Sequence, residues 1–88
     1  MKVIKFGAVW CNGCLVMKPR WAEIEKENPW LKTEFYDYDQ DKVMVDAYKV
    51  DEELPVAIIL DDQGNELKRF SGEVDKDELL RALKDISA

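Results

Sequence analysis

Histidine is absent from this 88-residue chain, and cysteine occurs only twice, as Cys11 and Cys14. A structural zinc ion takes four protein ligands, most often cysteine and histidine side chains. A single copy of the chain offers too few of these ligands, and only a dimer that shares both cysteine pairs would provide four thiolates. We therefore predict no metal site and expect the cysteines to serve another chemistry.

Long apolar runs are also missing. The longest nearly uncharged stretch, residues 56–60, is far too short to span a bilayer. The first six residues lack the continuous apolar stretch and small-residue cleavage site of a signal peptide, so we predict a cytoplasmic protein. Because the cytoplasm is reducing, two closely spaced cysteines there favour reversible chemistry or metal binding over a structural disulfide.

Positively charged residues are fewer than negatively charged ones: the chain has 13 lysines and arginines and 19 aspartates and glutamates, which gives a net charge of −6. Nucleic acids and anionic membranes repel such a chain at long range, so we predict neither as a partner. The charges are mixed in sign along the chain and 47% of the residues are hydrophobic, which is typical of a folded domain. The length allows one domain over residues 1–88, which we expect to be monomeric.

Apolar periodicity predicts four strands and three helices. The strands are expected at residues 3–8, 33–39, 56–60 and 66–70, and the helices at residues 12–28, 41–50 and from residue 75 onward. A helix between the first two strands makes them parallel, whereas the turn at residues 61–65 makes the last two an antiparallel hairpin. We predict an α/β fold of order βαβαββα, with a mixed four-stranded sheet flanked by helices on both faces.

Helical spacing also predicts which side chains face the core. The inward residues of the first and last helices are expected to be Met17, Trp21, Ile24, Leu79, Leu83 and Ile86. The three tyrosines, Tyr36, Tyr38 and Tyr48, are expected to pack on the strands and the second helix.

Cys11 directly follows the first predicted strand, and Cys14 lies in the first turn of the helix after it. The N-terminus of a helix presents unpaired N–H groups and the positive end of the helix dipole. Both stabilise a thiolate, which is the reactive form of cysteine. The spacing of three residues brings both sulfurs to one end of the helix, within bonding reach of each other.

At these positions the chain resembles the thioredoxin family. The segment Trp10-Cys11-Asn12-Gly13-Cys14 is similar to the family's Trp-Cys-x-x-Cys motif. Pro19 stands where the family has a helix-kinking proline, Pro55 where it places a cis-proline facing the disulfide, and Gly72 where a glycine precedes the last helix. The resemblance covers essentially the whole chain, without the extra N-terminal strand and helix of longer members.

The resemblance implies a protein-disulfide oxidoreductase whose only redox group is its own Cys11–Cys14 disulfide, with no cofactor. Cys11, expected to be the more exposed thiol, would attack a substrate disulfide, and Cys14 would resolve the mixed disulfide. The partners would be protein disulfide substrates and a thioredoxin reductase or another electron donor. The residues that would bind substrate are Trp10, Asn12, Gly13, Leu54, Pro55 and Gly72.

Lys5 departs from the family pattern, which usually has a buried aspartate six residues before the first cysteine. That carboxylate manages the proton of the second thiol. A cation at this position would favour the thiolate and make the protein a weaker reductant than ordinary thioredoxins. In the alternative interpretation Lys5 reaches solvent or pairs with a carboxylate, because lysine is rarely buried.

Two further departures lie beside the pair. Asn12-Gly13 stands between the cysteines, where the family more commonly has Gly-Pro, and the loss of proline loosens the turn. This dipeptide tunes the redox potential in the family, but Asn-Gly does not predict whether the potential rises or falls. The acidic segment Asp51-Glu52-Glu53 would favour substrates with a basic flank, or it would form a solvated loop.

Two other functions stay open at this stage. A glutathione-linked, glutaredoxin-type reductase fits the short chain, but Trp10 and the missing Cys-Pro-Tyr-Cys and Thr-Val-Pro segments argue against it. An interaction module with incidental thiols is the other, since a fold does not determine a function.

Overall fold

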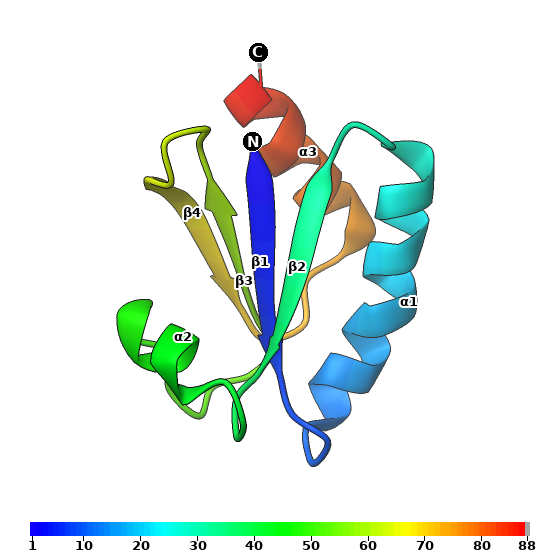
Figure 1. Ribbon diagram of the computed structural model, residues 1–88. Helices are drawn as coiled ribbons and strands as arrows, with labels where there is room; N and C mark the ends of the chain where they lie inside the picture. Colours follow the sequence, from blue (N-terminus) through cyan, green and yellow to red (C-terminus); the bar gives the residue numbers. More distant parts are fainter. Residues whose placement is uncertain (88) are drawn as a thin grey trace.

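A computed structural model describes residues 1–87. Four strands and three helices follow in the predicted βαβαββα order (Figure 1). The sheet runs in the spatial order β2-β1-β3-β4. The bounds are β1 Lys2–Gly7, α1 Asn12–Glu27, β2 Lys32–Asp37, α2 Lys42–Ala47, β3 Val56–Leu60, β4 Glu66–Ser71 and α3 Lys76–Ser87.

The strand pairing confirms the predicted mixed sheet. β1 pairs with β2 in parallel, with Lys5 opposite Phe35, because α1 carries the chain back along the sheet between them. β3 lies antiparallel to β1 on one side and to β4 on the other, and β4 follows it through a tight turn. β1 therefore lies inside the sheet, and its end at Gly7 delivers the chain to the cysteine pair.

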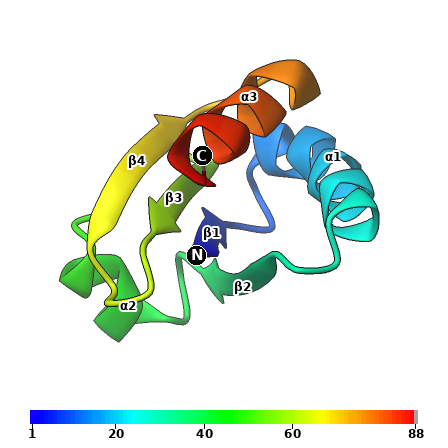
Figure 2. The same cartoon turned by 90° about the horizontal axis from the view of Figure 1, so that it is seen from above.

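Helices cover both faces of the sheet, as predicted. Figure 2 shows α1 and α3 on one face and α2 on the other. Successive side chains of a strand point to opposite faces, so Val3 of β1 joins the core under α1 and α3, while Ile4 and Phe6 join the core under α2. The predicted inward residues Met17, Trp21, Ile24, Leu79 and Leu83 are buried in the first core, and Ile86 packs against it. The three tyrosines pack against the second core.

Helix α1 begins and ends close to the prediction. Cys11 is its N-cap residue, and the backbone N–H and side-chain amide of Asn28 both donate to the Ile24 carbonyl at its C-terminus. Pro19 lies inside the helix, as expected. No helix within residues 1–87 combines the length and apolarity that crossing a bilayer requires.

Two elements are shorter than predicted. β2 ends at Asp37 because the Asp37 carboxylate accepts hydrogen bonds from the backbone N–H groups of Asp39 and Gln40, which turns the chain away from the sheet. α2 ends at Ala47, since Lys49 adopts a positive φ of 53° that a helix cannot continue. Residues 38–39 and 48–50, predicted as strand and helix, are turns and loop.

Candidate redox site

The cysteine pair lies where β1 passes into α1. Cys11 and Cys14 form a disulfide with their Cα atoms 5.3 Å apart. The Cys11 backbone N–H donates to the Ala8 carbonyl at 3.1 Å, which closes a tight turn before the helix. The Cys14 backbone N–H in turn donates to Cys11 Sγ at 3.2 Å. The first sulfur therefore caps the helix, in the position where an anion is best stabilised.

The exposure of the two cysteines differs from the expectation. Cys11 is buried, with 6% of its surface exposed, whereas Cys14 is half-buried and the more exposed of the two. The prediction that Cys11 is the more exposed thiol is wrong for this disulfide form. Cys14 Sγ packs closely over Gly7, since it lies 3.1 Å from the point where a Cβ on that residue would stand.

Pro55 lies close against one side of the cysteine turn. The Leu54–Pro55 peptide bond is cis. Pro55 Cδ lies 3.0 Å from the point that a Cβ on Gly13 would occupy, so any side chain at Gly13 would push Pro55 away by a few tenths of an ångström. The Gly72 N–H donates to the Pro55 carbonyl at 2.8 Å, and Gly72 adopts a positive φ of 83° that suits glycine.

Trp10 is half exposed beside the pair and is held in place. Its indole Nε1 donates to the Asp39 carboxylate at 2.8 Å, and its ring contacts Tyr38 edge-on at 6.2 Å between centroids. Asn12 is exposed at the start of α1. The structure thus gathers around the pair the residues that the sequence predicts there: Trp10, Asn12, Gly13, Pro55 and Gly72, with Leu54 next to Pro55.

Sequence reasoning missed two acidic residues at this site. Asp39 accepts the hydrogen bond from the Trp10 indole. Glu73 Cγ lies 3.4 Å from the point that a Cβ on Gly13 would occupy, so Glu73 packs beside Pro55 against the cysteine turn. Neither residue stands in a recognisable motif, and the one signal for Glu73 is its position directly after Gly72. Glu52 and Glu53 are exposed, and Asp51 accepts the Glu53 N–H at 3.0 Å, so this segment forms a solvated loop.

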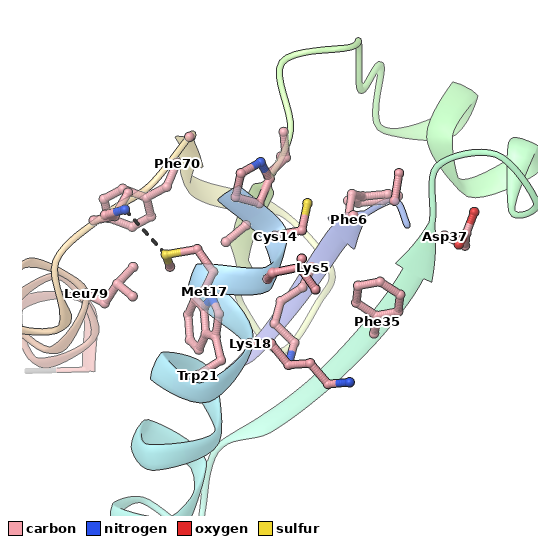
Figure 3. A pocket seen from close by; sticks show the side chains of 18 of the residues that line it. Lys5, Phe6, Cys14, Met17, Lys18, Trp21, Phe35, Asp37, Phe70 and Leu79 are labelled. Carbon is pink, nitrogen blue, oxygen red and sulfur yellow. Dashed lines mark hydrogen bonds between the residues drawn. The ribbon is translucent and has the colours of Figure 1, made fainter. Parts of the chain in front are cut away.

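Lys5 forms an ion pair with Glu25 of α1 at 2.9 Å, and its ammonium lies 5.8 Å from the centroid of the Trp21 ring. Its side chain is 19% exposed. Of the interpretations considered above, the pairing with a carboxylate is therefore observed. Figure 3 shows the Lys5 side chain running down from the level of Cys14 toward Trp21 and Lys18.

A cavity of about 390 Å³ lies beneath the first turns of α1, and Cys14 but not Cys11 lines it. Its walls are mainly apolar, with Met17 and Trp21 from α1 and Phe35 from β2, and it carries the charged groups of Lys5, Lys18 and Asp37 (Figure 3). Within residues 1–87 no group of three or more histidine, cysteine, aspartate or glutamate side chains is arranged to hold a metal ion.

A disulfide at the N-terminus of the first helix of a mixed four-stranded sheet defines a class of redox proteins, and comparison with known proteins assigns the family. The thioredoxin family model matches residues 1–85, so this chain belongs to the thioredoxin family. A thioredoxin H-type from Fagopyrum esculentum is 38% identical over 81 residues, which cover 92% of this chain and 67% of that protein.

Solved thioredoxin structures agree with this assignment. Thioredoxin from Trypanosoma brucei brucei is 30% identical, with a TM-score of 0.85 over 97% of this chain and 73% of that chain. Thioredoxin-2, a component of malaria parasite protein secretion machinery, has a TM-score of 0.88 over 96% of this chain and 81% of its own at 22% identity, which supports the fold alone. The family and the close cysteine pair together identify a thiol–disulfide oxidoreductase.

Proposed function

We propose that this protein reduces disulfide bonds in other proteins through a Cys11/Cys14 dithiol–disulfide cycle. The observation that carries the proposal is the Cys14 N–H directed at Cys11 Sγ at the N-terminus of α1. After reduction the same geometry stabilises a thiolate on Cys11. The exposure described above belongs to the disulfide form, whereas the attacking thiolate exists only after reduction.

In the proposed cycle the Cys11 thiolate attacks one sulfur of the substrate disulfide, and the other substrate sulfur leaves as a thiolate. A mixed disulfide then joins Cys11 to the substrate. The Cys14 thiolate attacks Cys11 Sγ, the mixed disulfide breaks, and the second substrate sulfur leaves. The protein is left with the Cys11–Cys14 disulfide, and an electron donor such as a thioredoxin reductase restores the dithiol.

The substrate would bind over the side of the pair that Pro55 and Trp10 line. An extended peptide can pair with the backbone at Leu54, as an added strand does. Asn12, Gly13 and Gly72 complete this surface, and Gly13 lets the substrate and Pro55 come close to the cysteine turn. We propose that residues 1–88 act as one monomeric domain without a cofactor. The cytoplasmic location stays a prediction.

Insulin reduction tests the proposal. The wild-type protein, kept reduced by thioredoxin reductase, is expected to precipitate insulin chains, and Cys11→Ser is expected to abolish this activity. Cys14→Ser is expected to accumulate a mixed disulfide with insulin, detectable by mass spectrometry, because the resolving thiolate is missing. A mixed disulfide that forms only with Cys11→Ser would contradict the assignment of roles. A parallel assay with glutathione as the donor tests the glutaredoxin-type alternative.

A further inference from the structure

The segment between β4 and α3 contacts its surroundings at three successive residues. The Gly72 N–H donates to the Pro55 carbonyl at 2.8 Å. Glu73 Cγ lies 3.4 Å from the point that a Cβ on Gly13 would occupy. Val74 is buried, with 8% of its surface exposed, and belongs to the core under α1 and α3. The position of Pro55 beside the cysteine turn therefore depends on what holds Val74.

Helix α1 holds Val74 through both of its backbone groups. The Val74 N–H donates to Met17 Sδ at 3.4 Å, which the dashed line in Figure 3 marks. The Val74 carbonyl accepts a hydrogen bond from Arg20 Nη1 at 2.7 Å, and the same nitrogen lies 3.5 Å from Met17 Sδ. A thioether sulfur is a weak acceptor, whereas a hydrogen bond from a charged guanidinium is strong. Arg20 therefore supplies the stronger of the two attachments.

Arg20 is placed for this contact by the helix that begins at the cysteine pair. Met17 and Arg20 are three residues apart, so they lie on the same face of α1. Arg20 is half-buried, and no carboxylate within residues 1–87 forms an ion pair with it. Its charge is directed instead at a backbone carbonyl of another segment. Helix α1 thus links the cysteine pair at its start to the segment that holds Pro55.

We propose that Arg20 is a positioning residue for the reduction of protein disulfides. By binding the Val74 carbonyl it fixes residues 72–74, and through the Gly72 N–H it fixes Pro55 beside the cysteine turn. A peptide that aligns its backbone at Pro55 needs this fixed distance, whereas a small disulfide has no backbone to align. Arg20 therefore sets the preference for protein disulfides over small ones. This inference rests on the proposed function and names a residue that determines its substrate class.

Backbone order in the segment can be observed directly. Arg20→Met keeps an apolar stem but loses the donors of the guanidinium. In the oxidised form of this variant, the NMR order parameters of the Gly72 and Glu73 amides are expected to fall from about 0.85 to about 0.6, while those of β1 stay near 0.85. A substitution that only lowers the stability of the fold would leave the order of both regions unchanged, and that result would overturn the proposal.

Substrate preference provides a second test. Reduced protein, prepared with dithiothreitol and desalted, is mixed with excess insulin or with uncharged 2-hydroxyethyl disulfide and quenched at intervals with N-ethylmaleimide. Mass spectrometry of the oxidised fraction gives a rate constant for each substrate. Arg20→Met is expected to lower the ratio of the insulin rate constant to the small-disulfide rate constant about tenfold.

Lys76→Met is the matched control, because it also removes a cation that contacts α1. The Lys76–Glu27 pair is open to solvent, so its loss should change the ratio by less than about twofold. Equal shifts in the two variants, or no shift in Arg20→Met, would overturn the proposal.

Arg20→Lys tests whether the hydrogen bond itself carries the effect. Lysine retains a charged donor on a long stem but lacks the planar fork, so the ratio should return to within about threefold of wild type. A ratio as low as that of Arg20→Met would refute the role of the hydrogen bond. Should Arg20→Met fail to fold, Arg20→Gln takes its place, with an expected drop of about fivefold, and an unchanged ratio there would refute the role equally.

These outcomes are separable from the proposed function. If reduced wild-type protein reduces insulin but Arg20→Met keeps the wild-type ratio, only this inference fails. If wild-type protein does not reduce insulin, the proposed function fails.

Discussion

The two sides of the cysteine turn differ in the groups that pack against them. On the Pro55 side, atoms of Pro55 and Glu73 lie 3.0 Å and 3.4 Å from the point beside Gly13 where a side chain would begin, and the Gly72 N–H fastens Pro55 in place. On the Gly7 side, Cys14 lines the cavity beneath α1. A missing side chain allows close packing on both sides: Pro55 and Glu73 approach at Gly13, whereas Cys14 Sγ and the Phe35 ring approach at Gly7.

This difference bears on the proposed function. Under that proposal a protein substrate would align its backbone against the fixed surface on the Pro55 side. On the Gly7 side, Cys14 Sγ packs over the end of β1 beside the Phe35 ring. Substitutions on the two sides should therefore affect different properties of the protein.

The largest effect is expected from Gly13→Val. The new side chain would collide with Pro55 and displace the surface on which the substrate aligns, so insulin reduction should fall about a hundredfold. Initial rates of insulin reduction measure this loss, with circular dichroism as a check on folding. Gly13→Ala, with a smaller side chain, should give an intermediate rate. A folded Gly13→Val with wild-type activity would show that close contact with Pro55 is unnecessary.

On the opposite side, Gly7→Ala should lower the free energy of unfolding of the oxidised protein by about 1–3 kcal/mol, because the methyl group would lie 3.1 Å from both Cys14 Sγ and the Phe35 ring. Urea titration measures this loss. Phe35 is exposed and its ring can shift outward, so the protein is expected to fold. Unchanged stability in Gly7→Ala would show that the ring and the sulfur move aside without cost.

A smaller effect is expected from Asp39→Ala, which removes the acceptor of the Trp10 indole hydrogen bond. This hydrogen bond is worth about 1 kcal/mol. If that energy positions Trp10 for the reaction, its loss should lower the rate of insulin reduction about fivefold. Asp39→Asn retains an oxygen acceptor and should recover much of the rate. Equal rates for the Ala and Asn variants would show that the hydrogen bond is not what positions Trp10.

Lys5→Met is expected to have only a modest effect on stability. The Lys5–Glu25 pair is partly exposed, so its loss should lower the free energy of unfolding by at most about 1 kcal/mol in urea titration. Lys2→Met on the same strand breaks a more exposed pair with Glu34 and should cost less. A titration of thiolate absorbance in Lys5→Met tests the predicted tuning of the cysteines, and an unchanged curve would refute that role.

The smallest effect, on the pH dependence of stability, is expected in the turn between β3 and β4, far from the cysteine turn. The pKa of Asp61 is lowered from 3.8, mainly because the Asn65 N–H donates to its carboxylate. A lowered pKa means that this carboxylate stabilises the fold above its unfolded pKa and that the stabilisation is lost as the pH falls through the folded pKa. Unfolding measured from about pH 5 down to about pH 2 should therefore depend less on pH in Asp61→Asn than in the exposed control Asp46→Asn.

Much of the fold and of the site could be predicted from the sequence because each depended on local signals. Alternating and helical apolar spacing placed all seven elements, and Cys11, Cys14 and Pro55 stood at positions with a known structural context. The exposure of Cys14, the approach of Glu73 and the pairing of Lys5 with Glu25 could not be predicted. Each of them depends on which side chains from distant segments meet in space, and periodicity carries no information on that.

The central position of β3 in the sheet determines how its amide protons exchange with solvent. All five of its residues are buried, and it is hydrogen bonded to β1 on one side and β4 on the other. Its amide protons can therefore exchange with deuterated solvent only when the sheet as a whole opens. The slowest-exchanging amides should lie in β3, and their protection factors should report the free energy of global unfolding, while the turns beside the cysteines exchange through smaller openings.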